Sequence, residues 1–461
     1  MNVYGIEVAI KNTPVLDKGF IPMAAFTSAF EASAKNGKDI AVAVERNQGQ
    51  MAVRHFRIHG TPEMAEADRV YVDRTVKMLL WAYGGYKVFI CGDDGMARVI
   101  KDAYQPGGSR EFDADFMSRV YEKPFEVVAL PLDKTPAEKT LAQSVGRHLD
   151  GCRIGFDAGG SDRKVSAVVD GVPVYSEEVV WFPKTNADPD YHFEGILSAF
   201  RTAASKMPRV DAIGVSSAGI YVDNRAMVAS LFLKVPRDLF DQKVKDIYIR
   251  AAKELGDIPL EVANDGDVTA LAGAMSLEEN RVLGIAMGTS EAAGYVDTDG
   301  NITGWLNELA FAPVDLQDDA MVDEWSGDKG CGVKYFSQDS VIKLAPRAGI
   351  ALDESLSPAE KLKVVQKEME EGRESARDIY RSIGVYLGHA LAYYAMYYSI
   401  AHVLLLGRVM SGEGGDLVIA EARRVLDEEY PEYAAMELHL PDEKIRRVGQ
   451  SVAAASLPQI D

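Results

Sequence analysis

The stretch 153–171, which reads RIGFDAGGSDRKVSAVVDG, decides the fold of this chain. Two apolar segments flank a turn that holds one aspartate, two adjacent glycines and a hydroxyl residue, so the pattern predicts a β-hairpin. Adjacent glycines allow an anionic group to approach the backbone amides closely, and an aspartate at a strand end suits a hydrated metal ion. The hairpin therefore predicts a site for phosphate and magnesium. Taken alone, an ordinary Asp-Gly-Gly turn between two strands explains the motif equally well.

Composition places the chain among globular proteins with room for two or three domains. Its 461 residues are 47% hydrophobic and 26% charged, with a formal net charge of −20. Nucleic-acid binding relies on clustered lysine and arginine, so this acidic balance predicts no nucleic-acid partner. No signal peptide opens the sequence and no run of about 20 apolar residues occurs, so we expect a cytoplasmic protein without membrane association. Three scattered cysteines predict reduced thiols rather than disulfides.

Strands and helices alternate along the chain, which predicts an α/β fold. A polar connector at 131–148 predicts a domain boundary, with an N-terminal α/β domain over 1–150 and a second domain over 151–461. Before the boundary we expect a hairpin at 39–59, a helix at 65–82 and strands at 86–91 and 125–130. After it we expect strands at 211–216, 260–263 and 402–407, helices at 193–206, 240–255, 416–426 and from about 267, and a long helical segment at 358–399.

Two further segments repeat the glycine and hydroxyl pattern of the first hairpin. One is a second predicted hairpin at 284–296, and the other is a strand at 403–407 followed by a glycine-rich turn and a helix. Their turn residues are Gly288, Thr289 and Ser290 in the hairpin, and Gly407, Ser411 and Gly412 in the other segment. Glycine after a buried strand lets a flat base lie on the backbone, although a plain strand-to-helix loop also explains the last segment.

The order of these motifs resembles that of the ROK family of sugar kinases, within the actin/hexokinase ATPase superfold. The matching segments are Asp157-Ala158-Gly159-Gly160-Ser161, 214–219, Asn264-Asp265, Gly288-Thr289-Ser290, 307–311, and Gly407 with Ser411-Gly412. The resemblance implies a two-lobed actin-like ATPase (ribonuclease H-like) fold from about residue 151, with an additional N-terminal α/β domain. It also implies ATP and Mg²⁺ as cofactors, with Asp157 at the metal. The glycines and hydroxyl residues of the three turns would then bind the nucleotide, with Gly159 and Gly288 facing one cleft.

Asp265 is the residue on which catalysis would depend. A kinase needs one carboxylate within hydrogen-bond reach of the acceptor hydroxyl to take its proton as phosphoryl transfer proceeds. Asn264 and Glu308 would bind further hydroxyls of a sugar or polyol. The alternative is that Asn264-Asp265 only caps a helix that begins near Asp267, and both uses are compatible.

The chain departs from the family pattern at the zinc site, in the acceptor pocket and in the phosphate hairpin. The family's zinc site uses one histidine and three cysteines, whereas Phe311 stands at the histidine position and only Cys331 remains. One thiol cannot supply four ligands, so we expect no bound zinc. Val333 stands where the family usually has a second sugar-binding glutamate. In the phosphate hairpin, residues with a Cβ atom replace several glycines, and Glu291 adds a carboxylate that would repel the γ-phosphate, point to solvent or help to hold magnesium.

These observations favour an ATP-dependent carbohydrate kinase that phosphorylates a hydroxyl of a sugar or related polyol. The alternative is a non-catalytic sensor that binds a sugar or nucleotide on the same fold, and Glu291, Phe311 and Val333 favour it. A ROK transcriptional repressor ranks last, because repressors of the family carry an N-terminal helix-turn-helix that the pattern of 1–150 does not match. The identity of the sugar, the role of residues 1–150 and the formation of a homodimer stay open.

Overall fold

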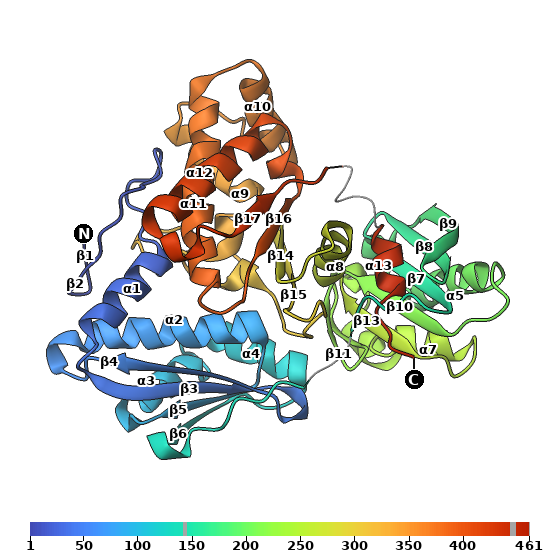
Figure 1. Cartoon of the computed structure of the whole chain (residues 1–461), viewed down its shortest axis with the longest axis horizontal. Coiled ribbons are helices and arrows are strands. Elements are labelled where there is room, and N and C mark those ends of the chain that lie inside the picture. Colours follow the sequence, from blue (N-terminus) through green and yellow to red (C-terminus); the bar gives the residue numbers. More distant parts are fainter. Residues whose placement is uncertain (142–144, 443–448, 461) are drawn as a thin grey trace. The chain divides into compact units, whose positions relative to one another are not determined.

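The computed structural model describes residues 1–141, 145–442 and 449–460 of the chain, and these form two compact units (Figure 1). The first unit comprises Met1–Leu141, Ile285–Ala292 and Leu306–Leu440, and the second comprises Ala142–Gly284, Ala293–Trp305 and Pro441–Asp461. The N-terminal segment therefore packs with a large part of the C-terminal half of the chain. The domain boundary near residue 150 stays a prediction.

A four-stranded sheet of order β4-β3-β5-β6 organises the N-terminal part of the first unit. Its strands are β3 (Lys38–Glu45), β4 (Met51–Ile58), β5 (Lys87–Cys91) and β6 (Glu126–Leu130), and its helices are α1 (Met23–Ser33), α2 (Ala65–Tyr83), α3 (Asp94–Tyr104) and α4 (Glu111–Tyr121). Residues 40–44 of β3 are all buried, as expected for a strand covered on both faces. Helix α2 lies along one face of this sheet in Figure 1. Two short strands, β1 (Asn2–Val3) and β2 (Ile6–Glu7), pair at the N-terminus.

A second sheet, of order β15-β14-β16-β17, carries the predicted nucleotide turns. Its strands are β14 (Val282–Met287), β15 (Glu291–Val296), β16 (His402–Leu406) and β17 (Glu437–His439). The helices of this region are α9 (Gln338–Arg347), α10 (Pro358–Glu370), α11 (Glu374–Tyr394) and α12 (Glu413–Glu429). The segment 358–399, predicted as one long helical stretch, is two helices. Gly372, whose φ of +77° continues no right-handed helix, separates α10 from α11.

The second unit contains a five-stranded sheet of order β13-β10-β7-β8-β9. Its strands are β7 (Cys152–Ala158), β8 (Asp162–Val169), β9 (Val172–Val180), β10 (Ala212–Ser217) and β13 (Leu260–Asn264). Strands β7 and β8 are antiparallel, which confirms the hairpin predicted at 153–171. Strands β10 and β13 run parallel to β7. The remaining elements are α5 (Pro189–Ala204), β11 (Ile220–Val222), β12 (Arg225–Val228), α6 (Arg237–Leu239), α7 (Ile247–Lys253), α8 (Asp265–Leu277) and α13 (Gln450–Ala455).

Two paired glycines allow the last helix to lie directly on this sheet. Gly155 of β7 and Gly214 of β10 are partners across the parallel strands. A Cβ atom on either glycine would lie 1.7 Å from a backbone carbonyl oxygen of α13, that of Ser451 or that of Ala454. Helix α13, red in Figure 1, therefore packs on strands that lie far earlier in the sequence.

Among the described residues, no helix combines the length and the apolar composition that crossing a membrane requires.

Candidate active site

The register of the second unit's sheet brings the predicted catalytic residues to one edge. Asp157 on β7 lies opposite Ser216 on β10, and Ser216 lies opposite Ala263 on β13. Because the three strands are parallel, their carboxyl ends meet at the same edge. Asn264 ends β13, and Asp265 begins α8 directly after it. This edge is where open α/β sheets bind their ligands.

Hydrogen bonds connect the two aspartates through residues that no motif marks. Ser216 Oγ donates to Asp157 Oδ1 at 2.9 Å. Gln450, the first residue of α13, donates from Nε2 to Ser216 Oγ at 2.9 Å and to the carbonyl oxygen of Asp265 at 3.1 Å. Gln450 therefore joins the end of β10 to the start of α8 and holds both aspartate segments in register.

Burial shifts the pKa values of both aspartates upward. Burial raises the pKa of Asp157 to about 6 against the hydrogen bond from Ser216, and the nearby charge of Asp265 raises it further. Burial also raises the pKa of Asp265, opposed by the backbone amide of Gly266 and by the cation of Lys184. A pair of carboxylates that oppose each other's ionisation is stabilised by a bound cation. The oxygen donors at this edge thus fit Mg²⁺, and Asp157 is the residue that would hold it.

The side chain of Asn264 is engaged within the protein. Its Oδ1 accepts from the backbone amide of Gly266 at 2.7 Å, and its Nδ2 donates to the carbonyl oxygen of Gly219 at 2.7 Å. The capping role considered for the pair therefore belongs to Asn264, and α8 begins at Asp265 rather than near Asp267. One N–H and one lone pair remain on the amide, so its contact with a sugar hydroxyl stays a prediction.

The turn between β7 and β8 lies beside a lysine that sequence reasoning missed. Trp181 closes the turn, because its Nε1 donates to the carbonyl oxygen of Gly159 at 2.8 Å and its backbone amide donates to that of Ser161 at 3.1 Å. A Cβ atom on Gly160 would lie 2.9 Å from Nζ of Lys184, so only glycine lets the ammonium group approach the turn this closely. Lys184 is exposed and brings a cation to the predicted phosphate position.

The predicted nucleotide residues of the first unit lie at the ends of neighbouring strands. The amide of Gly288 donates to the carbonyl oxygen of Ser290 at 3.0 Å across Thr289, which forms the turn after β14. Gly407 follows β16, the neighbour of β14, with a φ of +94°. A Cβ atom there would lie 2.2 Å from the carbonyl oxygen of Met287, so glycine is required. The structure thus brings this turn and Gly407 together.

The glycines after β16 divide into two kinds. Gly412, which follows Ser411 and precedes α12, has a φ of +64° and open space where a Cβ would be. Gly414 and Gly415 are buried, and Cβ atoms on them would overlap the ring of Tyr380 and the carbonyl oxygen of Met410. Only the turn at Ser411 and Gly412 is therefore open to a ligand, while the next two glycines serve helix packing.

Glu291, whose orientation the sequence leaves open, is buried within the first unit. It is 3% exposed, and neither carboxylate oxygen makes a hydrogen bond within the described part of the chain. Oε2 would lie 2.5 Å from a Cβ on Gly332, so that glycine makes room for it. Burial, with the charge of Glu308 added, raises the pKa of Glu291 well above its ordinary value. Glu291 therefore does not point to solvent, and its burial favours the uncharged carboxyl.

The end of helix α2 holds the segment that carries Glu308. The backbone amide of Glu308 donates to the carbonyl oxygen of Trp81 at 3.0 Å, and that of Asn307 donates to the carbonyl oxygen of Ala82 at 2.9 Å. The ring of Phe311 packs on that of Trp81 with centroids 4.3 Å apart. The N-terminal segment thus fixes the backbone of the predicted sugar-binding glutamate.

An ionic network surrounds the one cysteine left from the family's zinc motif. Asp328, which accepts a 3.8 Å contact from Cys331 Sγ, pairs with three cations of the N-terminal helices. These cations are Arg74 at 2.9 Å, Lys77 at 3.1 Å and Arg110 at 2.5 Å. Burial alone would raise the pKa of Asp328, but the cations hold it well below its ordinary value. Among the described residues, Cys331 belongs to no group of three potential metal ligands.

The sheets and turns give the α/β fold that the motif order predicts, of the actin-like ATPase type. No protein-family model and no curated protein matches the sequence. Among solved structures, the ROK hexokinase from Thermus thermophilus is similar over 66% of this chain and 97% of its own, with 19% identity and a TM-score of 0.50. This likeness confirms the predicted fold and the resemblance to ROK proteins at the level of the fold.

Two further solved structures are similar to this chain at lower TM-scores. A ROK family transcriptional regulator, a homologue of the E. coli MLC protein, matches 67% of this chain and 79% of its own, with 18% identity and a TM-score of 0.49. A ROK family glucokinase from Streptomyces griseus, in complex with glucose and AMPPNP, matches 67% and 98%, with 19% identity and a TM-score of 0.45. Kinases and a regulator thus both occur among the similar structures.

Proposed function

We propose that this protein is an ATP- and Mg²⁺-dependent kinase that phosphorylates a hydroxyl group of a sugar or related polyol. The observation that carries the proposal is the pair of half-buried aspartates, Asp157 and Asp265, at the carboxyl edge of β7, β10 and β13. Burial raises the pKa of each, and their charges oppose one another. A structural role does not require two such groups, whereas a metal ligand and a general base do.

Each aspartate has a distinct role in this proposal. Asp157 would hold the magnesium ion that accompanies ATP, and ATP supplies the phosphoryl group that is transferred. Asp265 would take the proton of the acceptor hydroxyl, a task for which a raised pKa is favourable because the base then accepts a proton readily near neutral pH. Lys184 would neutralise phosphate charge beside Gly160.

The resemblance to sugar kinases assigns further roles to residues of the first unit. Gly288, Thr289 and Ser290 would bind phosphate oxygens, and Gly407 with Ser411 and Gly412 would bind the adenosine part. Glu308 would bind hydroxyls of the acceptor, and we propose that residues 1–141 serve to position it through the end of α2. The burial of Glu291 supports nucleotide binding, because burial favours the uncharged carboxyl, which does not repel a phosphate group as a carboxylate would.

A non-catalytic sensor remains the second candidate, because the buried Phe311 has replaced a polar residue in the predicted acceptor pocket. A coupled assay of ADP release over a panel of sugars, amino sugars and polyols separates the two functions. The kinase proposal predicts turnover with at least one acceptor that exceeds ADP release without an acceptor. Binding of ATP without turnover on the whole panel would instead support the sensor.

A further inference from the structure

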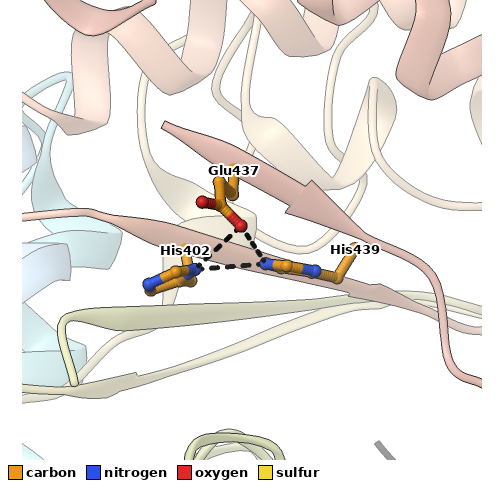
Figure 2. Close-up of side chains that lie close together, drawn as sticks. All are labelled: His402, Glu437 and His439. Atoms are coloured by element: carbon orange, nitrogen blue, oxygen red, sulfur yellow. Dashed lines mark hydrogen bonds and ion pairs between the residues drawn. The ribbon is translucent and has the colours of Figure 1, made fainter. Parts of the chain in front are cut away.

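Two histidines and a glutamate converge on neighbouring strands of the first unit (Figure 2). Strands β16 and β17 are parallel, with His402 opposite Glu437 and Leu404 opposite His439. Glu437 and His439 are two residues apart on one strand, so their side chains leave the same face of the sheet. His402 lies beside them on the adjacent strand. The strand pairing itself therefore assembles the cluster.

The potential ligand atoms lie close together. His402 Nδ1 and His439 Nε2 are 3.2 Å apart, and each lies 3.8 Å from Glu437 Oε2. The histidine side chains are 13% and 19% exposed, whereas that of Glu437 is 66% exposed. The two rings are thus fixed by their surroundings, and the carboxylate lies on the open side, where an ion could enter.

We propose that His402, Glu437 and His439 form a binding site for a divalent transition-metal ion, with Zn²⁺ as the best match. Zinc binds imidazole nitrogen at about 2.0–2.1 Å, so two nitrogens of a tetrahedral zinc site lie about 3.3 Å apart. The observed separation of the two imidazole nitrogens, 3.2 Å, agrees with this value. Because the side chain of Glu437 is largely exposed, its carboxylate can move toward an ion bound by the two histidines. Two nitrogens and one oxygen favour zinc, cobalt, nickel or copper over Mg²⁺ and Ca²⁺, which prefer oxygen ligands.

The proposal revises the expectation that the chain binds no zinc. That expectation rests on the segment around Cys331, where the family's ligands have been replaced, and it still applies there. The new site lies on β16 and β17 and uses no cysteine. Its function would be structural, since β17 is a three-residue strand at the edge of the sheet and pairs with β16 alone. A metal ion would stabilise the pairing of β17 with β16, the strand that precedes Gly407.

Zinc titration of chelator-treated, full-length protein by calorimetry tests this site. Wild type should bind one equivalent of Zn²⁺, and Co²⁺ should give the absorption of a tetrahedral complex. His439→Gln and Glu437→Gln should each weaken zinc binding, by a factor on the order of 10² for the histidine. His55→Gln, at an exposed histidine on β4, is the matched control and should bind like wild type.

Three results would overturn the proposal. The first is no binding of Zn²⁺ by wild type at millimolar concentration, and the second is unchanged affinity in both His439→Gln and Glu437→Gln. The third is equal weakening by His55→Gln, which would indicate unspecific surface binding. Since Glu437 is mostly exposed, its variant should fold even where a histidine variant does not, and circular dichroism checks this for each protein.

Discussion

The raised pKa of Asp157 predicts that the side chain proposed to hold magnesium destabilises the protein when no metal is bound. Its pKa of about 6 lies roughly two units above the ordinary value of 3.8. Both the folded and the unfolded state hold the proton below about pH 4, so the group has no effect on stability there. Between pH 4 and pH 6 only the folded state keeps it, and the free energy of unfolding falls by about 1.4 kcal/mol per pH unit.

The loss therefore reaches about 3 kcal/mol at pH 7. Asp157→Asn removes the charge and can still accept the hydrogen bond from Ser216. We expect the variant to exceed wild type in local stability by up to about 3 kcal/mol at pH 7.5, with the difference shrinking toward pH 4.5. Hydrogen exchange of peptides from β7 and β10, corrected for the intrinsic pH dependence of exchange, measures this directly.

Asp257→Asn is the matched control, because Asp257 lies in the same unit at an exposed position. It should change neither the local stability nor its pH dependence. Addition of Mg²⁺ should slow exchange in wild type and leave Asp157→Asn unchanged. The reasoning is refuted if Asp157→Asn is no more stable than wild type at pH 7.5, or if its gain is the same at pH 4.5.

Three other substitutions have defined outcomes. Glu291→Gln replaces a carboxyl whose pKa is raised by burial, so we expect higher stability than wild type at pH 8 and little difference near pH 4, measured by thermal denaturation across pH. Asp328→Asn leaves three buried cations with one anion fewer and should cost about 3–5 kcal/mol in urea unfolding, whereas the exposed Asp319→Asn should cost little. Lys184→Ala should weaken ATP binding in calorimetry about tenfold without changing the melting temperature, and the exposed Lys253→Ala should leave binding intact.

The fold could be predicted from the sequence because short, local motifs indicate it. Each turn that carries glycine beside a hydroxyl residue specifies a hairpin or a strand end by itself, and the chain order of the turns specifies the superfold. The helical segment at 358–399 shows the limit of this reasoning. Its apolar pattern continues across Gly372, so the break between α10 and α11 depends on the backbone conformation of one residue.

The site is only partly readable, because several of its features depend on contacts between distant segments. Gln450 and Lys184 belong to no motif, and only the packing of α13 and the loop after β9 brings them to the aspartates and to Gly160. The orientation of Glu291 depends on the space left by Gly332. His402 and His439 become neighbours only through the pairing of β16 and β17. Strand register and side-chain burial determine the positions of these residues, and neither can be inferred from the local sequence pattern.

The most direct test of the kinase proposal compares wild type with Asp265→Asn in the ADP-release assay, using the acceptor that gives the highest turnover. The substitution keeps the size of the side chain and removes the proton acceptor. If Asp265 is the general base, turnover should fall by a factor on the order of 10²–10⁴ with ATP affinity nearly unchanged. Equal turnover by the two proteins would contradict the catalytic role of Asp265 and leave it as a structural residue at the start of α8.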